Sequence, residues 1–386
     1  MPVETLRWQG TRPGFVRMLE QTLLPGQQVM LDVHTVPEMV DAIYRLAVRG
    51  APAIGVAAAY GLCLGIQDLD GEQPDHVLAR ARAAAEVLGR ARPTAVNLFW
   101  ALDRMLGRGA REHAAGADGK ALVEAFLQEA HTIFAEDRSS CRRMGELGAE
   151  LILDGHTLLT HCNAGALATA GMGTALAPMY VAVEQGKHIR VFCDETRPLL
   201  QGARITAWEL TQAGIPVTLI ADSAAARVMS EGRIDAVFVG SDRIARNGDV
   251  CNKIGTYSVA LAAARHDVPF HVVAPLSTID PSLVSGAEIP IEERPAAEIT
   301  GGGAERTAPE GVDVYNPAFD VTPAELVTSI ITEVGRIERP DLGGVEQALR
   351  RGGVALEATG APRGAGGRKT IDRPPSQPAR DIEQTF

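Results

Sequence analysis

The first third of the chain alternates apolar and polar residues with the period of helices. From residue 36 to residue 47, apolar residues recur at steps of three and four, which places them on one face of a helix. Thr35 stands three residues before Glu38, the spacing of a capping box at a helix start. Similar patterns predict helices over 53–66, 76–90, 96–106 and 121–153. Only the segment 6–31 has the short apolar runs and turns that are typical of a few small strands.

The pattern changes after Gly155, where short β-branched runs alternate with helix-length segments. We expect strands at 157–161, 189–193, 217–221, 236–240 and 270–274. The helices between them are expected at 166–184, 203–213, 224–231 and 255–265. Such alternation with short connections predicts a doubly wound parallel sheet with right-handed crossovers. The fold class is therefore α/β.

Three regions follow from these patterns. Residues 1–125 form a mostly helical N-terminal domain with a few short strands, and residues 126–345 form the domain that holds the parallel sheet. After Pro340 the sequence becomes rich in Gly, Pro, Arg and Ala. Such a composition cannot bury enough apolar surface to fold, so we expect residues 346–386 to be a disordered tail.

Composition and charge exclude several classes of protein. The chain of 386 residues is 46% hydrophobic but only 4% aromatic, and its formal net charge is −11. A negative field repels polyanions, which argues against a nucleic acid partner. The N-terminus lacks a secretory signal pattern, and the most apolar segment, 51–66, is shorter than the ~20 residues that cross a bilayer. We expect a cytoplasmic protein with no membrane partner.

Polar residues follow the predicted strands at one edge of the sheet. His161-Cys162-Asn163, Asp194-Glu195-Thr196-Arg197, Asp222-Ser223 and Ser241-Asp242-Arg243 each stand at the end of a predicted strand. Ligands of open α/β sheets bind outside the carboxyl ends of the strands. The sequence therefore predicts a site at this edge.

Cys162 and Asp242 are the candidates for chemistry in that site. Cysteine is often a small buried apolar residue, but a thiol that faces helix N-termini and a basic partner can act as a base or nucleophile. No acyl-transfer signature surrounds Cys162, so we favour a base or a transition-state contact. Asp242 could simply cap a turn, yet in a dry cleft its pKa would rise and it could act as a general acid. His161 is expected to be structural, because neighbouring strand residues face opposite ways.

Three short segments predict an anion site. Arg49-Gly50-Ala51 places a guanidinium and free amides at a helix start, and Arg92 precedes another helix whose cap could be Thr94 or Asn97. Asn252 and Lys253 are expected to open a third helix, where amide groups favour a phosphate. Either arginine could also be an ordinary charge at a helix end. Together the three segments indicate a cleft between domains that binds a phosphate monoester.

No cofactor is expected. The stretch GMGTAL at 171–176 lacks the third glycine of a dinucleotide motif, and no phosphate-binding loop of nucleotide enzymes occurs. The five cysteines are scattered without metal-ligand spacing, which argues against a zinc site.

Several long motifs carry a resemblance to a known family. RGAPAIG (49–55), THCNAGALATAGMGTAL (160–176), DETRPLLQGARITAWEL (194–210) and GSDRIARNGDVCNKIGTY (240–257) are the clearest of them. Together with the segments at 92–102 and 316–333, they resemble methylthioribose-1-phosphate isomerases over about residues 6–341. These enzymes belong to a superfamily that also contains regulatory subunits of the initiation factor eIF2B.

The resemblance implies a Rossmann-like catalytic domain, a homodimer and a sugar phosphate substrate. The implied reaction converts 5-methylthioribose 1-phosphate to 5-methylthioribulose 1-phosphate in methionine salvage. Cys162 would be the base or transition-state stabiliser, and Asp242 the proton donor. The implied substrate contacts are Arg49, Gly50, Ala51, Arg92, Gln201, Asn252 and Lys253. Gln201 enters only through the resemblance.

Three alternatives stay open at this point. A ribose-1,5-bisphosphate isomerase would need an extra cationic contact for its second phosphate, whereas a methylthio group needs an apolar pocket. A permissive pocket would accept other 5-deoxypentose 1-phosphates. A regulatory subunit like those of eIF2B would act through interaction alone, and the presence of both Cys162 and Asp242 argues against it.

Overall fold

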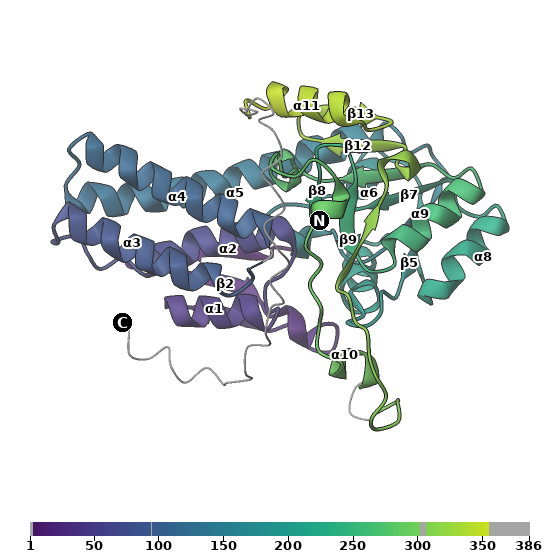
Figure 1. The fold of residues 1–386 in the computed structure, drawn as a ribbon, viewed down its shortest axis with the longest axis horizontal. Coiled ribbons are helices and arrows are strands. Elements are labelled where there is room, and N and C mark those ends of the chain that lie inside the picture. Colours follow the sequence, from purple (N-terminus) through teal and green to yellow (C-terminus); the bar gives the residue numbers. More distant parts are fainter. Residues whose placement is uncertain (1–2, 94, 302–305, 355–386) are drawn as a thin grey trace.

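Two parts of the chain lie side by side in the computed structural model, which describes residues 3–93, 95–301 and 306–354. A bundle of long helices occupies the left of Figure 1, and a sheet covered by helices occupies the right. The arrangement follows the change of pattern in the sequence near Gly155.

The helical part is built around α2 (Ala51–Leu64), whose residues from Ala53 to Leu64 are all buried. A helix that is apolar on every side must be covered on every side. The helices around it are α1 (Val36–Tyr44), α3 (Pro74–Gly89), α4 (Val96–Ala114) and α5 (Gly119–Ala149). The predicted capping box at Thr35 and Glu38 is confirmed.

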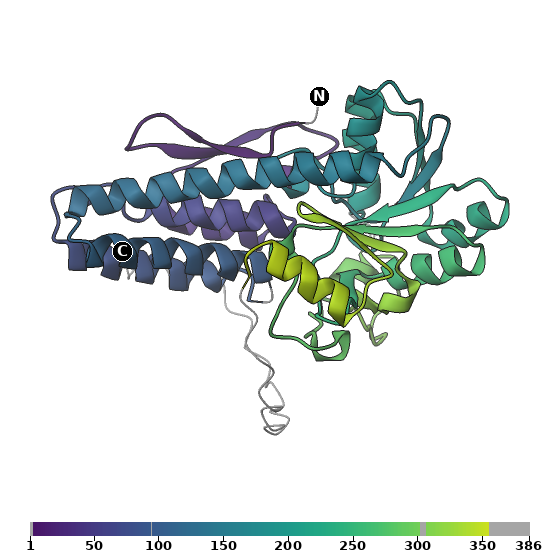
Figure 2. The same ribbon diagram turned by 90° about the horizontal axis from the view of Figure 1, so that it is seen from above.

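A small antiparallel sheet lies along this bundle, as the view from above shows (Figure 2). It contains β1 (Leu6–Gln9), β2 (Phe15–Leu19) and β3 (Met30–Val33), in that order. Leu6, Val16, Met18 and Val33 face inward and join the core of the bundle. These are the short strands expected between residues 6 and 31.

Helix α5 connects the two parts. Its first half packs in the core of the bundle through Leu122 and Phe126, while Met144 and Ala149 belong to the core of the sheet part. The expected domain boundary between residues 125 and 126 falls inside this continuous helix, and it stays a prediction.

The second part contains a seven-stranded sheet with the order β13-β12-β10-β7-β4-β5-β6. All neighbours are parallel except β12 and β13. The five predicted strands are confirmed to within a residue at each end, and the two strands that were not predicted, β12 and β13, lie together at one end of the sheet. The strands are β4 (Thr157–Thr160), β5 (Arg190–Asp194), β6 (Val217–Ile220), β7 (Ala236–Val239), β10 (Phe270–Val273), β12 (Ser329–Thr332) and β13 (Gly335–Glu338).

Helices cover both faces of this sheet, which confirms the doubly wound α/β class. On one face lie the end of α5, α6 (Ala177–Glu184) and α7 (Ala207–Gln212). On the other lie α8 (Ala225–Ser230), α9 (Thr256–Arg265) and α11 (Leu342–Arg351). Successive residues of a strand serve opposite faces, so Leu158 joins the first core and Leu159 the second.

The expectation of one helix over residues 166–184 is wrong: η2 (Ala166–Ala168) ends early and α6 begins at Ala177. Between them the hydroxyl of Thr169 accepts the N–H groups of Gly171 and Gly173, both at 3.0 Å, and Gly173 has φ of 89°. This side chain satisfies donors that a helix would otherwise pair.

The expected tail is also wrong for residues 346–351, which belong to α11. Asp341 caps this helix by accepting the N–H of Gly344 at 2.7 Å. Val345, Ala348 and Leu349 are spaced by three and four residues and are buried in the sheet core, so the helix has an apolar face to bury. The expected disorder of residues 355–386 lies outside the described residues.

A third sheet, of order β11-β9-β8, was not expected. It contains β8 (Arg243–Ile244), β9 (Val250–Lys253) and β11 (Phe319–Thr322), all paired antiparallel. The remaining short helices are η1 (Gln21–Leu23), the π-helical turn η3 (Gly202–Thr206), η4 (Asp222–Ala224), η5 (Leu276–Thr278), η6 (Gly286–Glu288), α10 (Ala297–Thr300) and η7 (Ala324–Leu326). Across the described ranges, every helix is too short or too polar to cross a bilayer.

Candidate active site

A cavity lies where the carboxyl ends of β4, β5 and β7 meet the beginnings of α2 and α4. All nine residues that the sequence reading assigned to the site line it: Arg49, Gly50, Ala51, Arg92, Cys162, Gln201, Asp242, Asn252 and Lys253. Its volume is about 110 Å³. A single water needs ~10–15 Å³ on the same measure, so the cavity has room for a small ligand.

Cys162 lies two residues after the end of β4, and its side chain is partly exposed while the other four cysteines are buried. Burial raises the pKa of its thiol, whereas Lys253 and Arg49 lower it. The two cations offset part of the effect of burial, and the pKa of the thiol stays above its ordinary value.

Asp242 lies after β7, and its N–H donates to the carbonyl of Cys251 at 2.9 Å. Burial raises the pKa of this carboxyl group, and Lys253, Arg92 and Arg49 lower it. Its charge in turn raises the pKa of Cys162. Asp242 and Cys162 thus share one cavity and influence each other's ionisation.

Asn252 and Lys253 do not open a helix as expected. They end strand β9, and α9 begins at Thr256 after Gly255. The ammonium group of Lys253 lies 4.6 Å from the ring centroid of Phe319, which also lines the cavity. A side chain on a paired strand is placed more firmly than one on a loop, so the sheet fixes this cation at the site.

Arg49 lies just before α2, where the sequence reading placed it. Its guanidinium donates to Gln21 Oε1 at 3.2 Å, to the carbonyl of Asn163 at 3.0 Å and to Asn163 Oδ1. Gly50 next to it has φ of 93°, and a Cβ atom there would lie 2.5 Å from Ala168. Only glycine fits this position, and Ala51 begins the helix.

Arg92 is bound differently. Its guanidinium lies 3.4 Å from the carboxylate of Glu292, which also binds Arg294 at 2.9 Å. Helix α4 begins at Val96 with Ala95 at the cap, so Asn97 lies inside the helix, and Thr94 lies outside the described residues. Glu292 and Arg294 line the cavity, and nothing near them in the sequence pointed to the site.

Gln201 precedes the π-helical turn η3 and is buried. Its side-chain oxygen has no hydrogen-bond partner among residues 3–93, 95–301 and 306–354. A buried acceptor without a donor is costly, and a ligand with a hydroxyl group could supply that donor. The resemblance brought Gln201 into the site, and the cavity includes it.

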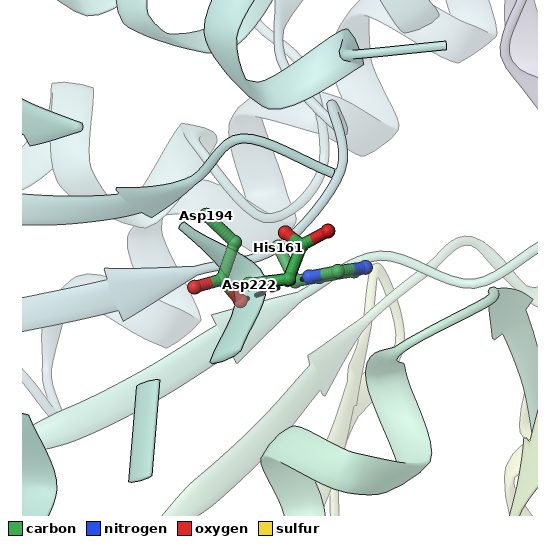
Figure 3. Close-up of side chains that lie close together, drawn as sticks. All are labelled: His161, Asp194 and Asp222. Carbon is green, nitrogen blue, oxygen red and sulfur yellow. Dashed lines mark hydrogen bonds and ion pairs between the residues drawn. The ribbon is translucent and has the colours of Figure 1, made fainter. Parts of the chain in front are cut away.

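His161, Asp194 and Asp222 form a cluster (Figure 3), with ligand atoms within 4.8 Å of one another. His161 Nδ1 lies 2.9 Å from Asp194, and Nε2 lies 2.9 Å from the carbonyl of Ile254. Asp222 accepts the N–H groups of Thr196 and Arg197. Although a His and two carboxylates are metal-ligand types, each already has a protein partner. His161 also lines the cavity beside Cys162, because β4 ends at Thr160 and the alternation of strand residues does not extend to these two side chains.

The charge state of His161 follows from its partners. Burial alone would lower its pKa, but the hydrogen bond and the charge of Asp194 raise it above the ordinary value. A ring that faces a carboxylate at one nitrogen and a carbonyl at the other has an acceptor at both. One proton therefore lies on Nε2 and points to the Ile254 carbonyl, and a second lies between Nδ1 and the Asp194 carboxylate. His161 is thus bound on both sides.

Comparison with known proteins places this chain in a family. The model of the Initiation factor 2 subunit family matches residues 47–339. The 5-deoxyribose 1-phosphate isomerase of Moorella thermoacetica is 56% identical over 339 residues, 88% of this chain and 95% of the relative. The methylthioribose-1-phosphate isomerase of Syntrophotalea carbinolica is 56% identical over 324 residues, 84% and 94% of the two chains.

Two solved structures are similar along most of their length. The 5-methylthioribose 1-phosphate isomerase of Pyrococcus horikoshii aligns with a TM-score of 0.83 and 44% identity, over 91% of this chain and 96% of its own. A structure described as translation initiation factor eIF-2B, subunit delta, from A. fulgidus aligns with a TM-score of 0.80 and 44% identity, over 90% and 99%. The chain therefore belongs to the Initiation factor 2 subunit family and, within it, to the group that holds the methylthioribose-1-phosphate isomerases.

Proposed function

We propose that the protein is an aldose-ketose isomerase that converts 5-methylthioribose 1-phosphate to 5-methylthioribulose 1-phosphate, the methionine salvage reaction that the resemblance implies. The observation that carries the proposal is the cavity itself, which brings Cys162, Asp242 and Lys253 together from three separate strands. Relatives of this name at 52–56% identity support the choice of substrate.

The chemistry requires an acid. A phosphate on C1 prevents spontaneous ring opening, so the enzyme must break the bond between C1 and the ring oxygen while the oxygen receives a proton. Asp242 is the proton donor, because burial raises the pKa of its carboxyl group and keeps it protonated to a higher pH. The same carboxylate recovers a proton from the C2 hydroxyl group when the ketone forms.

Hydrogen then moves from C2 to C1. In one route the Cys162 thiolate takes it as a proton, an enol forms between C1 and C2, and the thiol then returns the proton to C1 as the ketone forms. In the other route it moves as a hydride, and the thiol only stabilises the transition state. Lys253 and Arg49 act on the thiol in both cases, and a site closed to water favours both.

The charges of the cavity fit one phosphate. Within the described residues, no carboxylate lies within 4 Å of Arg49 or Lys253. Arg92 and Arg294 are bound to Glu292, and Arg243 to Asp280. A second phosphate would have to compete with these carboxylates. This argues against ribose 1,5-bisphosphate as the substrate.

A second candidate substrate is 5-deoxyribose 1-phosphate. The Moorella thermoacetica relative that carries this name is 56% identical to the chain. Both sugars have an apolar group at C5, and Ile289, Pro290 and Phe319 supply apolar surface in the cavity. Since the two differ only in the size of that group, the pocket could accept either.

A panel of substrates tests the proposal. The purified protein is assayed with 5-methylthioribose 1-phosphate, 5-deoxyribose 1-phosphate and ribose 1,5-bisphosphate, without added metal or nucleotide. We expect turnover of the first two, with kcat/KM higher for the methylthio sugar. Failure on all three sugars would support a regulatory subunit that works by interaction.

Two substitutions test the catalytic roles. Cys162→Ser and Asp242→Asn should each lose most of kcat while the fold is kept. Cys63→Ala in α2 and Asp70→Asn are the matched controls, because they make similar changes outside the cavity. Normal turnover in either catalytic variant would refute its role.

We further propose that the protein is a homodimer and that it is cytoplasmic. Both follow from the resemblance and the composition, and neither depends on the catalytic assignment. Sedimentation equilibrium of the purified chain tests the dimer, since a monomeric mass at micromolar concentration would contradict it.

A further inference from the structure

The backbone of Cys162 has an unusual conformation. Its φ is 64°, in the left-handed region that residues with a Cβ atom rarely adopt. Thr196, at the end of the neighbouring strand, has the same φ of 64°. Such conformations persist only where the surrounding structure enforces them, and they gather at functional sites.

Two threonine hydroxyl groups enforce the conformation of Cys162. Its N–H donates to Thr196 Oγ1 at 2.9 Å, and its carbonyl accepts from Thr206 Oγ1 at 2.6 Å. Both threonines are fully buried. The peptide groups on both sides of Cys162 are therefore each bound by one side chain.

A second layer fixes Thr196. The carboxylate of Asp222 accepts the N–H groups of Thr196 and Arg197, both at 2.7 Å. The Thr196 hydroxyl donates to the carbonyl of Asp194 at 3.1 Å, which leaves its lone pairs for Cys162. Asp222, which Figure 3 shows beside His161 and Asp194, does not line the cavity and acts through the Thr196 backbone.

The residues on either side of Cys162 bind the segments that carry Lys253 and Arg49. His161 bonds to the carbonyl of Ile254, the residue after Lys253. Asn163 accepts from Arg49 through both its carbonyl and its side chain. Three consecutive residues thus fix the thiol relative to Lys253 on one side and Arg49 on the other.

We propose that Thr196 and Thr206 are positioning residues that hold Cys162 in the left-handed conformation and so place its thiol between Lys253 and Arg49. The role in turnover rests on the proposed function, while the placement of the thiol does not. Neither threonine lines the cavity, so their hydroxyl groups act through Cys162 and, for Thr206, also through Asn163, whose side-chain N–H it accepts at 3.1 Å.

The test uses valine, which keeps the shape of threonine and removes the hydroxyl group. Thr196→Val and Thr206→Val should each lower kcat about 10–100-fold, because small displacements of a reacting group are costly. KM should change by less than about threefold, since substrate binding is untouched. Thr196→Ser keeps the hydroxyl group and should restore most of kcat.

Alkylation of the thiol gives a readout that does not depend on turnover. Cys162 is partly exposed and the other four cysteines are buried, so iodoacetamide should label it selectively, as mass spectrometry can verify. In the valine variants we expect the pH midpoint of labelling to rise, because the thiol moves away from Lys253 and Arg49. A purely structural role for the threonines would leave this midpoint unchanged.

Thr332→Val is the matched control. Thr332 is also fully buried and donates its hydroxyl hydrogen to Gly335 at 2.9 Å, but it lies in β12, away from the cavity. It should keep the labelling profile and kcat of the wild type. Should Thr206→Val fail to fold, the Thr196 variants still decide the question.

Two outcomes would overturn the proposal: valine variants with wild-type kcat and labelling, or a Thr196→Ser variant that loses as much as Thr196→Val. If the wild type turns over none of the three sugars, the proposed function fails. The labelling profile then decides the placement of the thiol alone.

Discussion

The two walls of the cavity bind an arginine in opposite ways. On the inner wall, formed by Arg49, Cys162 and Asn163, the guanidinium is buried and bound by neutral oxygen atoms. On the outer wall, formed by Arg92, Glu292 and Arg294, both guanidinium groups contact the Glu292 carboxylate and remain partly exposed, and Arg294 also pairs with Glu298 at 2.6 Å.

The difference decides how much charge each wall offers to a ligand. Neutral acceptors orient the Arg49 guanidinium and leave its full charge, whereas Glu292 offsets much of the charge of Arg92. Burial alone would raise the pKa of Glu292, but Arg92 and Arg294 hold it below the usual range. The inner wall therefore presents a net cation, and the outer wall a nearly neutral group of ion pairs.

The largest effect is expected for Arg49→Met. This change removes the cation beside Cys162 and leaves acceptors of Asn163 and Gln21 buried without a donor. Hydrogen bonds to charged groups contribute ~1.5–3 kcal/mol each, so we expect kcat/KM to fall by about 10²-fold or more. Steady-state kinetics with the methylthio sugar measures this loss.

Arg49→Lys is the control for that experiment. It keeps the charge but loses the forked geometry that bonds to Asn163 twice, so its activity should lie between those of the wild type and the methionine variant. If kcat/KM of Arg49→Lys were as low as that of Arg49→Met, the inner wall would act through the orientation of the guanidinium and not through its charge.

Arg92→Met should cost less, because its charge is already offset. We expect kcat/KM to fall by about tenfold, the size of one hydrogen bond to a charged group. Thermal unfolding of both arginine variants separates binding from stability. If kcat/KM falls as far as in Arg49→Met, the inner and outer walls offer the ligand the same charge, and the proposed difference between them is wrong.

The sequence predicted one wall better than the other. Arg49 stands between two strong helical patterns, and Gly50 marks the helix start, so its place could be inferred from local signals. Arg92 was assigned for the same reason, but its partner Glu292 lies 200 residues further along the chain. No local pattern reports a pairing over that distance.

Strands that are defined by pairing with a distant segment are also hard to predict from the local sequence. Buried parallel strands such as β7 and β10 are continuous apolar runs, which are easy to identify. Strand β9 carries Asn252 and Lys253 and is defined by its pairing with the distant β11, so the local pattern alone predicted a helix start at these residues. Their place in the cavity agrees with the resemblance, while the prediction of their local structure was wrong.

Glu292→Gln tests the outer wall with a smaller effect. Removing the carboxylate's charge leaves Arg92 and Arg294 without their shared partner. Ribose 1,5-bisphosphate should then inhibit more strongly, by up to about fivefold in its inhibition constant, the scale of a partly exposed ion pair. Asp70→Asn, which neutralises an acid away from the cavity, is the control and should leave inhibition unchanged. Unchanged inhibition in Glu292→Gln would show that Glu292 does not limit binding of a second phosphate.

The smallest effect is on how the free energy of unfolding depends on pH. This dependence, measured relative to wild type, should have opposite signs in Asp242→Asn and in Glu292→Gln. The folded-state pKa of Asp242 is raised, chiefly by burial. A raised carboxyl pKa means that the folded state binds more protons than the unfolded state, so stability falls as pH rises through this range. Asp242→Asn should therefore gain stability relative to wild type between pH 4 and pH 8.

Glu292 should behave in the reverse way, because its folded-state pKa is lowered. Its contribution is present above the unfolded pKa and is lost as pH falls through the folded one, so Glu292→Gln should lose stability relative to wild type as pH rises, by at most ~1 kcal/mol for a partly exposed pair. Urea unfolding of both variants at pH 4 and pH 8 measures the two slopes. Slopes of the same sign would mean that the two carboxyl groups share one environment, and the distinction between the walls would not hold.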